Sequence, residues 1–348
     1  MRNNSLGRLR SCLGRAASRI AAPLLLAAFL AAPCGSPALA DDAGNCSGKN
    51  VLLQLRETDP PRYRAIMDDA SKITNSYSVF WKIEKPGVEP SWLFGTMHSN
   101  DARVLELSDK FQDAFDKIDT LILELKEVSN PTAIAMELFK HPELTMLPAG
   151  KTLDHILPAE ETAQVAAGLA KKGIPIASVL RMRPWFLYTG LLLPCGGDPN
   201  SKDGYILDRR LAEQAEENGV DVEGLETPLE QFQALADLSD ETTMKGLLEA
   251  FKLPYSMSDV METLTELYLT GNIGLMKALS DGLSDDKTAD LAFNKRVVTD
   301  RNEVMAKRIL PYLEKGNVMM AVGALHLPGD HGVVELLRRQ GFTVTSVN

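Results

Sequence analysis

The sequence predicts an α/β fold, a central mixed β-sheet flanked by helices with a helical insertion. Short apolar or alternating runs, which are typical of strands, lie towards the two ends of the chain. Aliphatic residues at helical spacing dominate the sequence between them. Strands and helices in this order indicate a layered α/β architecture. The sequence contains no low-complexity segment and no repeat at a solenoid period, either of which would indicate another fold class.

The first forty residues predict a secretory signal peptide. Five arginines and no acidic residue accompany the apolar stretch Ile20–Ala32, which is shorter than the ~20 residues of a membrane span. Ala38–Ala40 supplies a small-x-small cleavage site. Cys34 would allow a lipoprotein, but Pro33 stands where that processing needs a small residue. An uncleaved anchor is the alternative. We expect cleavage after Ala40, a single domain over 41–348, and a periplasmic or secreted protein.

Charge and cysteine content exclude two classes of function. Loss of the five arginines takes the net charge from −10 to −15, and such an acidic surface repels nucleic-acid phosphates. Beyond residue 40, no apolar run is long enough to span a membrane. Cys46 and Cys195 remain after cleavage, and an even pair in an oxidising compartment favours a disulfide. One pair of cysteines is a poor zinc signature.

Six short segments predict the strands of the sheet: Val79–Glu84, Ser91–Met97, Thr120–Leu125, Val220–Glu226, Val318–Gly323 and Thr343–Val347. The first two are joined by a turn-rich connection that suits a hairpin. Residues 128–200 contain prolines, helical stretches and no clear strand, which predicts the helical insertion over the sheet.

Three helices follow from their local signals. Asp203–Glu217 has helical aliphatic spacing. Thr227 and Glu230 form a capping box, with Pro228 at the first helical position. Asp330 is the predicted N-cap of a last helix that ends before Gly341.

One local pattern, an apolar strand leading into Gly-x-x-His, occurs twice. It ends at His98 in one copy and at His326 in the other, more than two hundred residues later. A single histidine of this kind is often a hydrogen-bonded core residue. Two copies favour a shared site, because both imidazoles would emerge at one edge of the sheet, where open α/β folds bind ligands.

Two glutamates occur at the ends of apolar runs. Glu124 ends the run Leu121–Leu123, and Glu226 follows Leu225. Each could simply face solvent, but a buried carboxylate must be paired, protonated or metal-bound. Two imidazoles with one or two carboxylates suit zinc, manganese or a similar divalent ion. Such an ion can activate water for hydrolysis.

Arg301 and Asn302 form a third unusual feature. Arg301 falls within a predicted apolar stripe of Val297, Val298, Val304 and Met305. Its stem could run along the core to reach water. Alternatively, its charge is directed at the site, where it holds Glu226 or a substrate oxyanion.

These residues together resemble the TraB/GumN family, which includes the animal Tiki proteins. The resemblance covers most of the mature chain and rests on these motifs: Trp81–Ile83, Leu93–His98, Glu124, Gly224–Thr227 with Gln231, Arg301-Asn302 with Met305-Ala306, and Val322–Gly329. Asp330 fills the place of the acid that usually follows the last glycine. Residues 128–200 match least.

The resemblance implies a sheet related to erythromycin esterase and to a haem-binding lipoprotein fold. The Tiki members are manganese- or cobalt-dependent proteases. We therefore expect a metal-dependent hydrolase, most simply a peptidase, that binds manganese, cobalt or zinc and acts on a peptide or small-molecule substrate. The expected metal ligands are His98, Glu124 and His326. The expected catalytic residues are Glu226, as a further ligand or general base, with Arg301 and Asn302.

Two other functions remain open at this point. The first is a binding protein that holds haem, a metal or a small ligand on the same fold without turnover. The second is an esterase-like hydrolase that uses histidine and glutamate as acid and base without a metal. No Gly-x-Ser-x-Gly motif is present to indicate a serine nucleophile.

Overall fold

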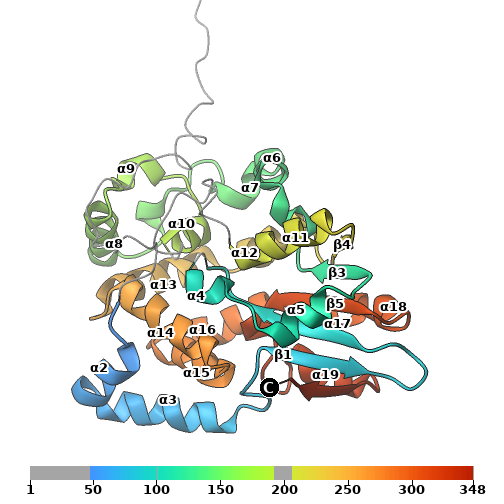
Figure 1. Ribbon diagram of the computed structural model, residues 1–348. Helices are drawn as coiled ribbons and strands as arrows, with labels where there is room; N and C mark the ends of the chain where they lie inside the picture. The colour runs from blue at the N-terminus through green and yellow to red at the C-terminus, as the bar shows by residue number, and fades with distance from the viewer. Residues whose placement is uncertain (1–47, 100, 192–205, 348) are drawn as a thin grey trace, which may run out of the picture. The chain divides into compact units, whose positions relative to one another are not determined.

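A computed structural model of the protein describes residues 48–99, 101–191 and 206–347. Six strands in this part of the chain form one mixed sheet in the order β4-β3-β5-β2-β1-β6 (Figure 1). They are β1 (Phe80–Glu84), β2 (Ser91–Thr96), β3 (Thr120–Leu123), β4 (Asp221–Gly224), β5 (Val318–Gly323) and β6 (Thr343–Ser346). The predicted α/β class and all six predicted strands are confirmed, with some ends one or two residues shorter.

Four neighbouring strands run parallel. β5 pairs with β3 on one side and with β2 on the other, and β4 pairs with β3. β1 forms the expected antiparallel hairpin with β2, and β6 pairs antiparallel with β1. β5 reads Val-Met-Met-Ala-Val-Gly and is buried up to its last residue, as expected for a parallel strand covered on both faces. The carboxyl ends of β2, β3, β4 and β5 therefore meet at one edge.

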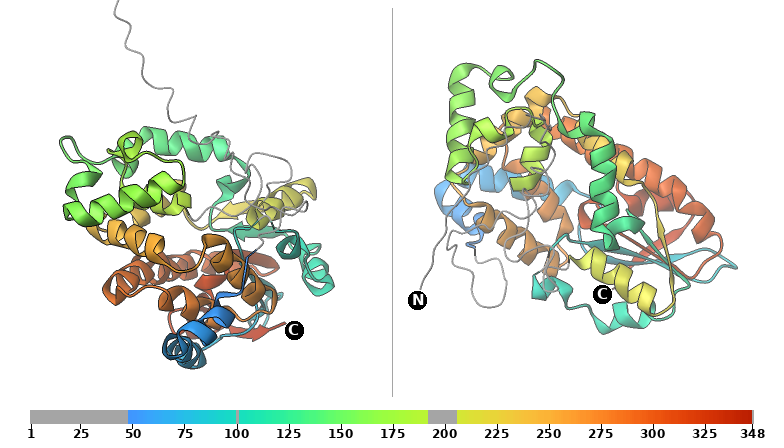
Figure 2. Two further views of the ribbon diagram at one scale, coloured as in Figure 1. Left: turned by 90° about the vertical axis from the view of Figure 1, so that its left-hand side faces the viewer. Right: turned by 90° about the horizontal axis from the view of Figure 1, so that it is seen from above.

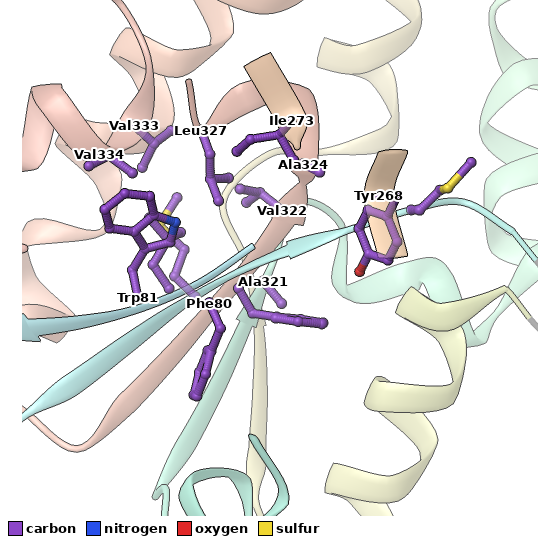
Figure 3. Close-up of a cluster of buried hydrophobic side chains, with 14 of the residues drawn as sticks. Phe80, Trp81, Tyr268, Ile273, Ala321, Val322, Ala324, Leu327, Val333 and Val334 are labelled. Atoms are coloured by element: carbon purple, nitrogen blue, oxygen red, sulfur yellow. The ribbon is translucent and has the colours of Figure 1, made fainter. Parts of the chain in front are cut away.

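Alternate side chains of the strands build apolar layers on both faces of the sheet. Figure 3 shows Trp81 and Val322 on the side of Val333, while Phe80 points to the opposite side. There Phe80 contacts Phe111 of α5, with ring centroids 5.5 Å apart. The period-two alternation of a strand accounts for this separation of neighbouring residues.

Helices cover the sheet and extend beyond it. Near the amino end, α2 and α3 lie beside α14 and α15 (Figure 2). The helices are α2 (Val51–Thr58), α3 (Pro60–Lys72), α4 (Ala102–Leu105), α5 (Asp109–Phe115), α11 (Leu207–Glu217), α12 (Pro228–Ala236), α13 (Asp240–Lys252), α14 (Met257–Leu269), α15 (Ile273–Gly282), α16 (Lys287–Phe293), α17 (Asp300–Arg308), α18 (Leu310–Leu313) and α19 (Val333–Arg339).

The described part of residues 128–200 is helical, as predicted. It contains α6 (Pro131–Lys140), α7 (Pro142–Thr145), α8 (Ala159–Lys171), α9 (Ile176–Val179) and α10 (Pro184–Leu191). An apolar cluster separate from the main core joins α8 to α13, with Val165, Leu169 and Leu247 fully buried. Gly168 on α8 leaves room for the Phe251 ring, since a Cβ there would lie 2.3 Å from it.

Local sequence signals predicted the start of α12 correctly and the start of α19 incorrectly. The capping box of α12 is present, because Thr227 and Glu230 bond reciprocally. The prediction of Asp330 as an N-cap is wrong. α19 begins at Val333 after Gly332, and Asp330 instead accepts a hydrogen bond from Thr74 Oγ1 at 3.0 Å. Gly341 follows the helix with φ of 90°, a conformation that glycine adopts without strain.

Several predictions concern residues outside the described ranges. These include the signal peptide over 1–40, both cysteines of the expected disulfide (Cys46 and Cys195), and the start of the helix expected from Asp203. Within the ranges that are described, no helix has the length and apolar character needed to cross a membrane.

Candidate functional site

Four ionisable side chains follow the four parallel strands at one edge of the sheet. His98 lies two residues after β2, and Glu124 directly follows β3. Glu226 lies two residues after β4, and His326 ends the short helix η4 (Ala324–His326) that continues β5. The sequence predicted these positions, and the strand order brings Glu124 and His326 together, with Glu124 Oε1 3.6 Å from His326 Nε2.

The glycines of the two Gly-x-x-His motifs permit this close approach. A Cβ on Gly95 would lie 3.0 Å from the Ala324 Cα, so the first motif leaves room for the turn of the second. A Cβ on Gly323 would lie 3.3 Å from Glu124 Oε1. The Gly323 N–H donates to that same oxygen at 2.7 Å. A backbone donor therefore fixes Glu124 against the end of β5.

Arg301 joins the two glutamates. Its Nη2 donates to Glu124 Oε2 and to Glu226 Oε2, both at 2.6 Å, and its Nε donates to Glu226 Oε1 at 3.0 Å. Gln231 on α12 adds a neutral donor, with Nε2 3.1 Å from each carboxylate. The prediction that Arg301 holds Glu226 is thus realised in the geometry, and Glu124 shares the same guanidinium.

Burial and charge set the protonation of this cluster. Glu124 and Glu226 are 8% and 7% exposed. Burial opposes ionisation of Glu124, but the charges of Arg301 and His98, with the hydrogen bond from the Gly323 N–H, more than offset it, so the pKa of Glu124 lies below its ordinary value. Burial likewise disfavours the Arg301 cation, and its bonds to Glu226 and Glu124 overcome this and raise its pKa. The cluster holds a cation between two buried carboxyl groups.

Asn302 fixes the orientation and tautomer of His326. Asn302 Nδ2 donates to the backbone oxygens of His326 at 3.2 Å and His331 at 2.8 Å, so its Oδ1 is the acceptor. That oxygen lies 2.5 Å from His326 Nδ1, which must carry a proton. Burial, with the nearby Arg301 charge, lowers the pKa of His326 to about 4. The ring is neutral at pH 7, and Nε2 carries the lone pair.

The helix that carries Arg301 and Asn302 differs from the predicted one. Residues Asn294–Thr299 form a π-helix, η3, ahead of α17. In the regular helix α17 that follows, Asn302, Met305 and Ala306 are buried while Val304 is 37% exposed. The predicted apolar stripe through Val304 is therefore wrong, because the buried side of α17 runs through Asn302, Met305 and Ala306.

His98 is bound to a carboxylate that the sequence analysis missed. Its Nδ1 lies 2.7 Å from Asp208 Oδ2, and Thr96 Oγ1 donates to Asp208 Oδ1 at 2.7 Å. Asp208 is 5% exposed and lies in the first turn of α11. Its charge raises the pKa of His98 to about 9. The signal was its spacing from Leu211 and Ala215, which places it on the apolar face of the helix.

The side chains at this edge are of the types that bind divalent ions. Within the described ranges, no three His, Cys, Asp or Glu side chains converge closely enough to hold an ion. Two ligands ~2.1 Å from a tetrahedral ion lie ~3.4 Å apart, close to the 3.6 Å between His326 Nε2 and Glu124 Oε1. Both imidazoles donate Nδ1–H to a fixed oxygen, as metal-binding histidines do.

Comparison with known proteins finds distant relatives that are named TIKI metalloproteases. Metalloprotease TIKI2 of Danio rerio is 24% identical over 86% of this chain and 64% of its own length. Metalloprotease TIKI1 of Danio rerio is 24% identical over 77% of this chain and 62% of its own. The metalloprotease TIKI homolog of Amphimedon queenslandica is 24% identical, over 79% and 62%. The chain thus spans less than two thirds of the length of these relatives.

No solved structure gives a significant match, so the relation to erythromycin esterase stays a prediction. The model of the TraB/PrgY/gumN family matches residues 79–346. That range begins at β1 and contains both Gly-x-x-His motifs, both glutamates and Arg301. On this match, which covers most of the chain and every residue of the cluster, the protein belongs to the TraB/PrgY/gumN family.

Proposed function

We propose that the protein is a metal-dependent hydrolase, and specifically a peptidase. The observation that carries the proposal is the pair of imidazoles at one edge of the sheet, each with Nδ1 bound to a side-chain oxygen, so that Nε2 is the nitrogen that would bind a ligand. Arg301 Nη1 lies 3.4 Å from the Nε2 of His326. Two buried carboxyl groups lie beside them. The names of the relatives agree with this chemistry.

His98, His326 and Glu124 would hold the ion, which would be manganese, cobalt or zinc. When bound, such an ion polarises a carbonyl group and lowers the pKa of water from 15.7 to about 7. A metal-binding histidine must be neutral, and the lowered pKa of His326 satisfies this requirement at pH 7. His98, whose pKa Asp208 raises to about 9, would have to release a proton when the ion binds. The ionised carboxyl group of Glu124 would offset part of the charge of a dication.

Glu226 and Arg301 would act on the substrate side. Glu226 is a further ligand or the general base that takes a proton from the attacking water. Arg301 Nη1 lies 3.4 Å from His326 Nε2, and its positive charge would stabilise an oxyanion that develops next to this histidine. Asn302 acts through His326 and is a positioning residue rather than a catalytic one.

Metal content and peptide hydrolysis test this assignment in four variants. His98→Ala and His326→Ala should each lower the metal content of the purified protein sharply, and Glu124→Gln should do nearly as much. Arg301→Lys should keep the metal but lose turnover, because lysine keeps the charge without the planar fork. The ligand assignment is wrong if both histidine variants keep one ion per chain.

The His98–Asp208 pair favours one alternative, a hydrolase that needs no metal. A histidine backed by a buried carboxylate is the arrangement of a general base. Under that alternative, wild-type protein treated with a chelator would still hydrolyse the peptides. A haem absorbance band without any turnover would instead indicate a binding protein.

We also propose that the protein is exported. The basic and apolar segments of residues 1–40 carry this proposal. N-terminal sequencing should show that the exported protein begins at Asp41. A retained arginine-rich segment would contradict the proposed cleavage.

A further inference from the structure

Asp208 is a buried carboxylate to which neither the family resemblance nor the proposed chemistry gives a role. An unpaired carboxylate in the interior costs several kcal/mol, so its partners explain its presence. One oxygen accepts from the Thr96 hydroxyl and the other from His98 Nδ1–H, both at 2.7 Å. Both partners belong to the end of β2 and the loop after it. The N-cap of α11 is Ile206, so these bonds serve the strand end rather than the helix start.

Among the described residues, Asp208 is the hydrogen-bond partner of the His98 ring, and this bond matters because the ring is largely exposed. The side chain of His98 is 60% exposed, whereas that of Asp208 is 7% exposed. Packing therefore leaves the exposed imidazole free to turn, and the buried carboxylate provides the fixed end of the bond. Thr96 in turn fixes the carboxylate, which leaves it a single orientation towards His98.

The second histidine of the site is held in the same way by unrelated elements. His326 donates Nδ1–H to Asn302 Oδ1, and the Asn302 amide is fixed by two backbone oxygens. Asn302 comes from α17 and Asp208 from α11. In both imidazoles Nδ1 is bound to a fixed oxygen, so the nitrogen that would bind a ligand is Nε2 in each. That of His326 lies 3.4 Å from Arg301 Nη1.

We propose that Asp208, held by Thr96, is the positioning residue of His98, which keeps the proton on Nδ1 and presents Nε2 to the metal. The role of Nε2 rests on the proposed function, while the Nδ1 bond does not. A carboxylate or carbonyl partner of this kind orients a metal-binding histidine and makes it more basic, and its loss lowers metal affinity 10–100-fold in typical sites.

The first measurement needs no metal. The chain has five histidines, so ¹⁵N-labelled histidine gives few ring resonances, and His98→Ala identifies the one from His98. In metal-free wild-type protein, the His98 Nδ1 proton should exchange slowly with water. Asp208→Ala should abolish this protected proton while the Nδ1 proton of His326 remains.

The second measurement is zinc affinity by competition with a chelator. Asp208→Ala should bind zinc roughly 10–100-fold more weakly than the wild type. Thr96→Val should also bind zinc more weakly, and Thr96→Ser, which keeps the hydroxyl, should restore the wild-type affinity. Glu213→Gln is the matched control, because Glu213 lies on the same helix but pairs with Arg209 at 2.9 Å. Its zinc affinity should not change.

The outcomes separate this proposal from the proposed function. If the wild type binds no zinc, the metal assignment fails, and the Nδ1 proton alone decides the role of Asp208. If Asp208→Ala keeps the protected proton, or loses it with unchanged zinc affinity, the positioning role is wrong. Should Asp208→Ala fail to fold, the Thr96 pair decides, and equal behaviour of the valine and serine variants would overturn the proposal.

Discussion

Arg301 is the residue on which the two buried glutamates depend. Its Nη2 contacts both carboxylates while Nε contacts Glu226 alone, which requires a planar group with several donors. A lysine ammonium in this position would be a single point charge and could not keep all of these contacts aligned. Glu124 keeps its bond from the Gly323 N–H without Arg301, whereas Glu226 loses the contact to two donors, so Arg301→Lys should lower turnover more than metal content.

The residues of the site differ in how visible they are in the sequence. Glu124 and Glu226 stand out because each is an acidic residue at the end of an apolar run. The histidines stand out because their motif occurs twice. Asp208 was missed because an aspartate in the first turn of a helix is a common and favourable feature on a protein surface. Its partner His98 lies 110 residues earlier, and only the tertiary structure joins them.

At the scale of single elements, side chains of α12 and α17 form hydrogen bonds that hold the loop carrying Glu226. Glu230 of the capping box accepts from the Thr227 N–H at 2.8 Å and from Arg308 Nη2 at 2.6 Å. Arg308 also donates to the Leu225 carbonyl at 2.6 Å. The bond to Arg308, with the contacts to Thr227, lowers the pKa of Glu230 to about 2.

This arrangement predicts a pH-dependent contribution to stability. The folded pKa of Glu230 lies below its ordinary value near 4.5, so ionised Glu230 stabilises the fold above that pH. The contribution is lost as the pH falls through about 2. Glu230→Gln should therefore reduce the free energy of unfolding at pH 7 by roughly 0.5–1 kcal/mol, a small value because the pair is partly exposed. The difference should shrink as the pH falls from about 4.5 towards 2.

Urea unfolding of wild type and Glu230→Gln at a series of pH values measures this difference. Glu303→Gln removes the same charge from an exposed position on α17 and serves as the control. A difference between wild type and Glu230→Gln that is as large at pH 3 as at pH 7 would contradict the assignment.

The first residue of a helix, and the side of it that is buried, could be predicted only where the local sequence signal is clear and the helix is regular. The Thr-Pro-Leu-Glu signal of α12 is local, and it predicted the cap correctly. The π-helix η3 was not predictable from spacing, because one wider turn changes which residues face the core. In α17, which follows it, Asn302 is buried and Val304 is 37% exposed, the reverse of the predicted stripe.

At the scale of the whole described molecule, strand order creates the site. β5 comes from near the end of the chain but lies between β2 and β3, and this places the second Gly-x-x-His motif beside the first and beside Glu124. The sequence predicted each strand, yet it could not predict their order, because pairing depends on contacts between distant segments. The packing of α13 against α8 likewise joins segments that lie far apart in the sequence.

The contact between the two motifs gives a test of this arrangement. A Cβ on Gly95 would lie 3.0 Å from Ala324 Cα and 3.1 Å from Leu327 Cδ2, so any side chain there pushes β2 away from the turn of the second motif. Gly95→Val should lower the free energy of unfolding by about 1–3 kcal/mol, the usual cost of overpacking a core. Gly95→Ala should cost less, because its single methyl needs a shift of only a few tenths of an ångström.

The same displacement should weaken metal binding in the fraction that remains folded, since it moves His98 relative to His326. Gly246→Ala on α13 is the control, because a Cβ there meets nothing within 4 Å, and alanine in a helix is neutral or favourable by roughly 0.5–1 kcal/mol. Urea unfolding and zinc titration of the three variants give both quantities. If Gly95→Val were as stable as the wild type and bound zinc equally well, the two motifs would not depend on this close contact. If stability fell while zinc affinity per folded molecule stayed constant, the contact would support the sheet without setting the distance between the two histidines.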